Sequence, residues 1–140
     1  MVKVAREIED IKIRVNKIAG MVHYMLPDST RIINNQNIAK FGDTGIAETV
    51  RRMEELGAKR QFMVAKIAGG AKMFAIRAES NLSNLNVGDN NIESAKIHLA
   101  ALGIKLIAED TGLNYGRTIE FFAEDGSLKI KSVGREPKFI

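Results

Sequence analysis

Cysteine is absent from all 140 residues of the chain. This absence excludes disulfide bonds, thiolate metal sites and a thiol nucleophile supplied by the chain itself. Tryptophan is also absent, and aromatic residues make up only 6% of the sequence. No apolar run approaches the roughly 20 residues that a membrane-spanning helix requires, so we expect no membrane insertion. The first residues mix acids with bases and lack an apolar segment, so we expect no secretory signal and a cytoplasmic location.

The residues that are present are ordinary for a globular protein. Hydrophobic residues make up 45% and charged residues 27%, which argues against disorder. The length suits one domain with its own core, so we predict a single domain over residues 1–140. The net charge of +4 is scattered along the chain rather than gathered in a stripe with aromatics, so we expect no nucleic-acid binding. The positive surplus equally suits a negatively charged protein partner.

Hydrophobic periodicity predicts a mixed α+β domain. Two helices are expected, one capped by Asp43 or Thr44 and ending near Leu56, and one capped by Asn91 and ending at Leu102. The strands are expected at 11–15, 18–26, 61–68, 104–108, 118–123 and 128–133. The second of these is apolar almost throughout and is therefore expected at the centre of a sheet, whereas the tail after Gly134 is expected to fray.

Four segments hold more than packing requires: GMVHYMLPDS (20–29), AKIAGGAKMF (65–74), the stretch 86–112, and NYGR (114–117). Each has two interpretations. His23 in its apolar strand is by default a core residue. Gly69-Gly70 could bring backbone N–H groups close to a ligand, or could simply form a tight turn. The stretch 86–112 is explained by a polar link, a capped helix and a strand, and Arg117 could be an ordinary surface residue.

Other chemistry receives little support from the sequence. His23 and His98 are the only histidines, and His98 has no second ligand one helical turn away, so we expect no metal site. Glu109 and Asp110 could act as acid and base, but neighbouring residues of a strand point to opposite faces. No Gly-x-Ser-x-Gly motif marks a serine nucleophile.

Taken together and in this order, the segments resemble one family, the CheD-type chemoreceptor glutamine deamidases. The most specific parts are VNKIAGMVHYMLPDS, KFGDT at 40–44, AKIAGGAKMF, VGDNN, and GIKLIAEDTG followed by Gly116-Arg117. The resemblance implies a layered α/β/β/α domain with mixed sheets, of the cysteine-hydrolase-like CheD type, with no cofactor. It also implies hydrolysis of glutamine side chains on methyl-accepting chemotaxis receptors, and a chemotaxis phosphatase of the CheC type as a further partner.

The resemblance assigns His23 to the catalytic position. In the family's chemistry a cysteine thiolate attacks the carboxamide, and the histidine deprotonates the thiol and then protonates the departing nitrogen. Arg6 occupies the position of that cysteine in this sequence. Arginine cannot replace it, because the guanidinium stays protonated and offers no lone pair. We therefore expect this form of the chain to lack deamidase activity.

Residues 1–14 do not match the family, so we expect its first strand to be missing or altered and the first ten residues to pack poorly. Asn90 and Leu113 also depart from the family, which has arginine and glycine there. Three explanations stay open. The gene has lost its first segment; the chain is a non-catalytic paralogue that binds receptors or the phosphatase; or a separately encoded piece completes the fold.

Overall fold

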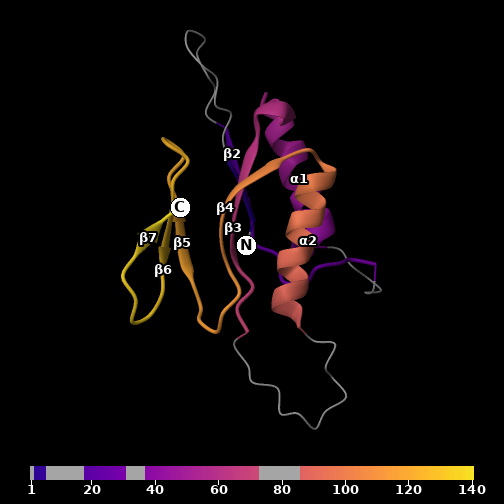
Figure 1. Ribbon diagram of the computed structural model, residues 1–140. Coiled ribbons are helices and arrows are strands. Elements are labelled where there is room, and N and C mark those ends of the chain that lie inside the picture. The colour runs from indigo at the N-terminus through magenta and orange to yellow at the C-terminus, as the bar shows by residue number, and fades with distance from the viewer. Residues whose placement is uncertain (1, 6–17, 31–36, 73–85) are drawn as a thin grey trace.

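The computed structural model describes residues 2–5, 18–30, 37–72 and 86–140 of the chain (Figure 1). Two helices pack on one side of a four-stranded sheet, and a three-stranded sheet lies on its other side (Figure 1). The predicted mixed α+β class is confirmed. The α/β/β/α layering of a cysteine-hydrolase-like fold is not confirmed, because both α-helices of the described residues belong to one layer.

The strands form two sheets. The larger has the order β2-β1-β3-β4 and the smaller the order β5-β6-β7. Only β3 and β4 run parallel; the other described pairs are antiparallel. The strands are β1 (Val2–Ala5), β2 (Ala19–Val22), β3 (Val64–Gly69), β4 (Lys105–Thr111), β5 (Thr118–Phe121), β6 (Leu128–Lys131) and β7 (Lys138–Phe139). The helices are α1 (Gly42–Glu55) and α2 (Val87–Ala101), with short 3-10 turns η1 (Ile38–Lys40) and η2 (Arg60–Phe62).

The N-terminal strand is the largest departure from expectation. β1 lies between β2 and β3, and its Val4 is opposite Gly20 on one side and Ala65 on the other. β2 is therefore an edge strand of the described sheet rather than its centre, and the expectation that the first ten residues pack poorly is wrong for Val2–Ala5. The physical reason is that a ladder needs only backbone N–H and C=O groups, which a divergent sequence still supplies. The strand expected at 11–15 lies outside the described residues.

Helix α1 ends as predicted but begins earlier. The buried residues Ile46, Val50 and Met53 recur at helical spacing, and the helix stops just before Gly57, whose φ is +104°. Its N-cap is Phe41, an extended residue without a capping side chain. The predicted caps Asp43 and Thr44 already lie inside the helix, where their side chains bind the preceding loop.

Helix α2 also begins earlier than predicted. Its first residue is Val87, so most of the polar link expected at 86–91 is helical, and Asn86 rather than Asn91 is the N-cap. Ser94, Ala95 and Leu99 form its buried face. The polar composition of residues 86–91 led us to predict a loop there. Residues at the start of a buried helix can also be polar where they bind neighbouring loops, as Asn91 does here.

The remaining strands follow the prediction with shifted ends. β3 begins after η2, three residues later than expected, and β4 continues to Thr111. The hairpin of β5 and β6 is confirmed. The tail is docked rather than frayed: β7 pairs with β6, and Ile140 and Leu128 exchange two backbone hydrogen bonds of 3.0 Å.

The core has two parts. The larger lies between the helices and the four-stranded sheet, and the smaller joins Ala68 of β3 to Leu128 and Ile130 of β6, which fixes the second sheet against the first. Fully buried side chains such as Ile46, Ile67 and Leu99 define the larger part. Among the helices of the described residues, none has the length and apolar character that a membrane span requires.

Candidate functional site

His23 follows directly after the edge strand β2, and its side chain is exposed. Burial alternates along this segment: Val22 and Tyr24 are buried in the core, whereas Met21, His23 and Met25 are exposed. Successive side chains of an extended chain point to opposite faces, so these three exposed side chains form one row. The default interpretation of His23 as a core residue is therefore wrong. His23 forms no hydrogen bond with any other residue that the structure describes.

The backbone around His23 is held by helix α2. The Tyr24 hydroxyl donates a hydrogen bond of 2.5 Å to the Asn91 carbonyl oxygen, and the Asn91 side-chain nitrogen donates one of 3.0 Å to the Met25 carbonyl oxygen. Burial raises the pKa of Tyr24 above its ordinary value, so this hydroxyl stays protonated as a donor. The exposed histidine thus stands on a backbone that is fixed on its buried side.

The segment that follows is held by both helices. The Ser94 hydroxyl donates to the Pro27 carbonyl oxygen at 2.8 Å, and the Ser29 hydroxyl donates to the Asp43 carboxylate at 2.6 Å. The Gly42 amide donates to the Leu26 carbonyl oxygen at 2.8 Å. The structure therefore brings together three of the segments that the sequence singled out: 20–29, 40–44 and 86–91.

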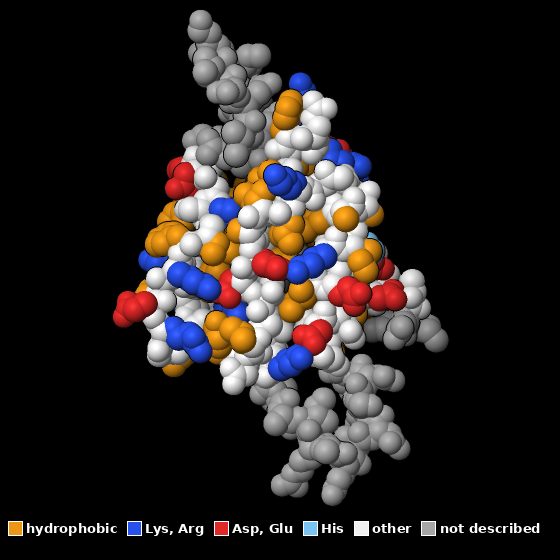
Figure 2. All heavy atoms as spheres, in the orientation of Figure 1, with side chains coloured by type: hydrophobic (Ala, Val, Ile, Leu, Met, Phe, Trp, Pro, Cys, Tyr) orange, Lys and Arg blue, Asp and Glu red, His pale blue; other side chains and the backbone are white. Residues whose placement is uncertain are grey.

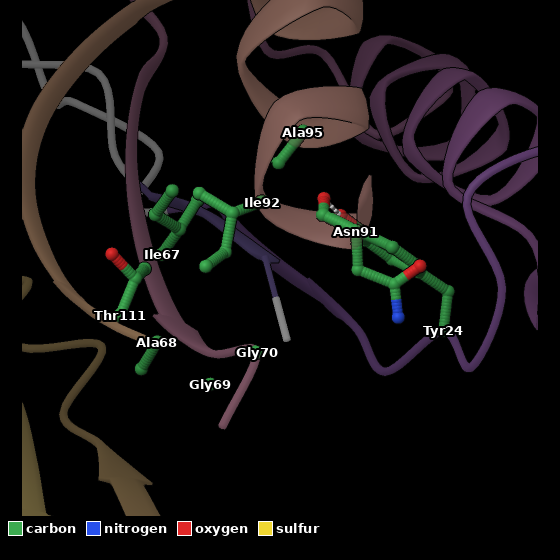
Figure 3. Close-up of a pocket in the computed structure, with 9 residues that line it drawn as sticks. All are labelled: Tyr24, Ile67, Ala68, Gly69, Gly70, Asn91, Ile92, Ala95 and Thr111. Atoms are coloured by element: carbon green, nitrogen blue, oxygen red, sulfur yellow. Dashed lines mark hydrogen bonds between the residues drawn. The ribbon is translucent and has the colours of Figure 1, made fainter. Parts of the chain in front are cut away.

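The paired glycines are a point of close packing. Gly69 and Gly70 both have positive φ angles, and a side chain on Gly70 would collide with Ile92 and with the backbone of Gly88 in α2. The cavity beside them measures about 10 Å³ and is lined by Tyr24, Ile67, Ala68, Gly69, Gly70, Asn91, Ile92, Ala95 and Thr111 (Figure 3). That volume admits one water molecule at most. The tight-turn interpretation fits, and a small-molecule site at these glycines does not.

Asp110 and Arg117 form a buried ion pair. Arg117 Nη2 lies 3.1 Å from Asp110 Oδ1, and only 2% and 6% of the two side chains is exposed. Glu109 points the other way and pairs with Lys96 on the surface, which confirms that the adjacent carboxylates face opposite sides. The expectation that Arg117 is a surface residue is wrong. The sequence signal that could have revealed it is the inward position of Asp110, since a buried carboxylate needs a partner.

Metal-binding geometry is not found in the described part of the chain, where no three His, Asp or Glu side chains come close enough to hold an ion. His98 lies in α2 and is not brought near His23 by any contact between described residues. Of the residues that the sequence assigned to the site, only His23 is described; Arg6 lies outside the described residues.

Comparison with known proteins gives a single answer. The model of the family described as CheD chemotactic sensory transduction matches residues 25–132. This chain belongs to the CheD family. A CheD relative from Lachnoclostridium phytofermentans, named probable chemoreceptor glutamine deamidase, is 60% identical over 124 residues, which cover 89% of this chain and 76% of the relative. A relative of the same name from Caldanaerobacter subterraneus is 46% identical over 126 residues, covering 90% and 76%.

A third CheD relative, named chemoreceptor glutamine deamidase, comes from Bacillus licheniformis; it is 42% identical over 118 residues, covering 84% of this chain and 69% of the relative. His23 and Arg6 both precede the residues that the CheD family model matches. Leu113, which stands where the resemblance places a glycine, has a φ of 61°. This left-handed conformation costs a leucine about 1–2 kcal/mol, a cost that glycine does not have.

Proposed function

We propose that these 140 residues act at methyl-accepting chemoreceptors, in the cytoplasm, as a single binding domain that does not itself deamidate glutamine. The partner class is supported by the names of the CheD relatives. The lack of catalysis is supported by one observation: His23 is exposed in a chain that contains no cysteine at all.

Glutamine deamidation places strict demands on the attacking group. The nucleophile adds to the carboxamide carbon, the C–N bond breaks, and ammonia leaves with a proton from the imidazole; water then cleaves the thioester and frees the carboxylate. Without sulfur, His23 could only activate water. A general base contributes about 10²–10⁴-fold, whereas enzymes accelerate reactions by at least about 10⁶-fold. A lone imidazole therefore leaves the rate far below that of an enzyme.

The contact offered to the receptor comes from the exposed apolar side chains of Met21 and Met25, which flank His23 in the same row; we call this row the His23 ridge. Both methionines are more than half exposed although they are apolar. Methionine is flexible and polarisable, and it is enriched at protein interfaces. The hydrogen bonds from Asn91 and Ser94 hold the backbone beneath and beyond the ridge. An exposed apolar row on a fixed backbone is suited to binding a protein surface.

The catalytic part of the proposal is tested by mass spectrometry of a receptor fragment incubated with the purified chain. Each deamidated glutamine adds about one dalton, because an amide becomes an acid. We expect no gain over a control without protein. Deamidation by the chain that disappears in His23→Ala but persists in His98→Ala would show that the site is active and would overturn this part.

The binding part is tested by calorimetry with the same fragment. We expect binding to persist in His23→Ala and to weaken at least about tenfold in Met21→Asp, because a charge is then buried against the partner. Ile97→Asp is the matched control, since Ile97 is an exposed apolar residue of α2 away from the ridge. Loss of binding in a folded His23→Ala variant, or no binding by the unaltered chain, contradicts the proposal. A CheC-type phosphatase in place of the receptor tests the second partner implied by the family.

A further inference from the structure

A second cavity lies far along the chain from the His23 ridge. It measures about 350 Å³ and opens between the end of β4, the turn that follows it, and the C-terminal segment. The polar and charged side chains in its wall are Asp110, Tyr115, Ser132, Arg135, Glu136 and Lys138. The volume is within the range of about 300–1,000 Å³ that ligand pockets occupy. The proposed receptor-binding function uses none of these residues.

Two guanidinium groups stack on Tyr115. The Cζ atom of Arg117 lies 4.4 Å from the centre of the ring, and that of Arg135 lies 4.0 Å from it. Arg117 is buried, and its guanidinium donates hydrogen bonds to the Gly112 and Tyr115 carbonyl oxygens and to Asp110. Arg135 is exposed, and its guanidinium donates to no acceptor among the described residues. Stacking on a ring leaves the N–H edge of a guanidinium free for an acceptor.

The charges around the cavity favour a single negative charge. Asp110 is already compensated, since Arg117 lies 3.1 Å from one oxygen and the Lys138 ammonium 3.2 Å from the other. Burial opposes ionisation of Asp110, but hydrogen bonds and charges from Arg117 and Lys138 outweigh it and lower its pKa, so the group stays ionised. With Arg117 buried beside the cavity and Arg135 and Lys138 in its wall, three cations lie near two carboxylates, Asp110 and Glu136. The excess of one positive charge suits a carboxylate better than a dianionic phosphate.

The Asp110–Arg117 ion pair leaves one polar atom of each residue incompletely hydrogen-bonded. Asp110 Oδ2 is buried and is met only by the Lys138 ammonium, at 3.2 Å, and Arg117 Nε is buried without an acceptor among the described residues. Buried polar atoms without partners are rare in native proteins. On the face shown in Figure 2, Lys and Arg side chains are spread over the whole face, the β5-β6-β7 side included, and acidic side chains lie among them. Arg135, by contrast, is exposed in the cavity wall and is accessible to an approaching anion.

We propose that this cavity binds the carboxylate of an acidic side chain from a protein partner, held by the free edge of Arg135. Arginine matches a carboxylate with two parallel N–H donors, which lysine cannot do. The Lys138 ammonium and the Ser132 hydroxyl are further donors in the same wall. The surplus positive charge of the whole chain attracts an acidic partner to it.

The test uses the full chain labelled with ¹⁵N and follows the backbone amide of Tyr115 and the arginine Nε–H signals by NMR. The probes are two capped tripeptides, one with a central glutamate and one with a central glutamine, and also acetate and inorganic phosphate. We expect saturable shifts with the glutamate peptide in the millimolar range and none with the glutamine peptide. Arg135→Gln and Arg135→Lys should each weaken binding at least about fivefold, because both remove the two-donor edge.

Lys105→Gln is the matched control, because it removes one positive charge from an exposed residue of β4 outside the cavity. Its affinity should stay within about twofold of the unaltered chain, since distant surface charges are screened. Four outcomes overturn the proposal: no saturation, equal binding of the glutamine peptide, tighter binding of phosphate, or an Arg135→Gln variant that binds normally. Acetate binding as tight as the peptide would assign the site to free small acids instead of a protein.

Discussion

The Tyr24 hydroxyl and the Asn91 carbonyl oxygen, 67 positions apart in the sequence, are joined by a hydrogen bond of 2.5 Å. This bond ties the backbone beside His23 to the first turns of α2. Because it joins the segment after β2 to helix α2, the bond can form only when these two parts of the fold are packed together. Its donor is a phenol held in the core, where only the neutral form is favourable.

Tyr24 should make the protein sensitive to alkali. Its folded pKa is raised by burial above the unfolded value of about 10. The stabilisation it gives is therefore complete below pH of about 10 and is lost as the pH rises towards the folded pKa. Tyr24→Phe should cost about 1–3 kcal/mol at pH 7, because the Asn91 carbonyl loses its donor, and much less at pH 11. Urea unfolding by circular dichroism at both pH values measures this; a difference independent of pH would contradict it.

The Asp110–Arg117 pair should dominate the electrostatic contribution to stability. Arg117→Met leaves a buried carboxylate without its buried partner and should cost about 3–5 kcal/mol. Lys138→Met removes the other partner of the same carboxylate, but Lys138 is 54% exposed, so its loss should cost at most about 1 kcal/mol. Equal costs for the two substitutions in urea unfolding would show that burial of the partner is unimportant here.

Acid should weaken the same pair. The pKa of Asp110 is lowered in the folded state, so its stabilisation is complete above the unfolded value of about 3.9 and is lost as the pH falls through the folded pKa. Asp110→Asn should be less stable than the unaltered chain at pH 6 and should lose less stability between pH 5 and pH 2. Unfolding should be measured across that range, with Glu93→Gln as the control for loss of an exposed carboxylate. Parallel acid curves for Asp110→Asn and the unaltered chain would contradict the assignment.

Gly88 should not tolerate alanine, although it lies in a helix. Alanine usually stabilises a helix by about 1 kcal/mol relative to glycine. Here the added Cβ would collide with the Gly70 carbonyl group, which is backbone and cannot rotate away. Gly88→Ala should therefore lose at least about 2 kcal/mol. Gly103→Ala is the control: its φ is +71° but nothing lies within 4 Å, so only conformational strain of about 1–2 kcal/mol is expected. A neutral Gly88→Ala would mean that Gly70 and the start of α2 are not in contact.

Replacing Leu113 with glycine should stabilise the protein. Its φ of 61° is strained for leucine, and its side chain is mostly exposed, so little burial would be lost. Leu113→Gly should raise the free energy of unfolding by about 1 kcal/mol through relief of that strain. Leu113→Ala keeps a Cβ in the same conformation and is the control, with no gain expected. Lower stability of the glycine variant would show that the exposed leucine packs against something.

The sequence revealed the local elements best where periodicity and a stop signal agree. Ile46, Val50 and Met53 together with Gly57 predicted most of α1, and the hairpin of β5 and β6 followed from alternation around a turn. The start of α2 was missed, because Asn86 and Asn91 are both good caps and only packing selects between them. The membership in the CheD family was also readable from the order of the motifs, and the family comparison confirms it.

The sequence by itself determined the chemistry that this chain can supply: a histidine at position 23, and no sulfur nucleophile in 140 residues. It also determined the α+β class, because periodicity is a local property of the chain. Only the tertiary structure decided that His23 is exposed, that Val2–Ala5 enters the middle of a sheet, and that Arg117 is buried against Asp110. These three facts depend on contacts between residues distant in sequence, and side-chain burial is set by what the fold places opposite each residue.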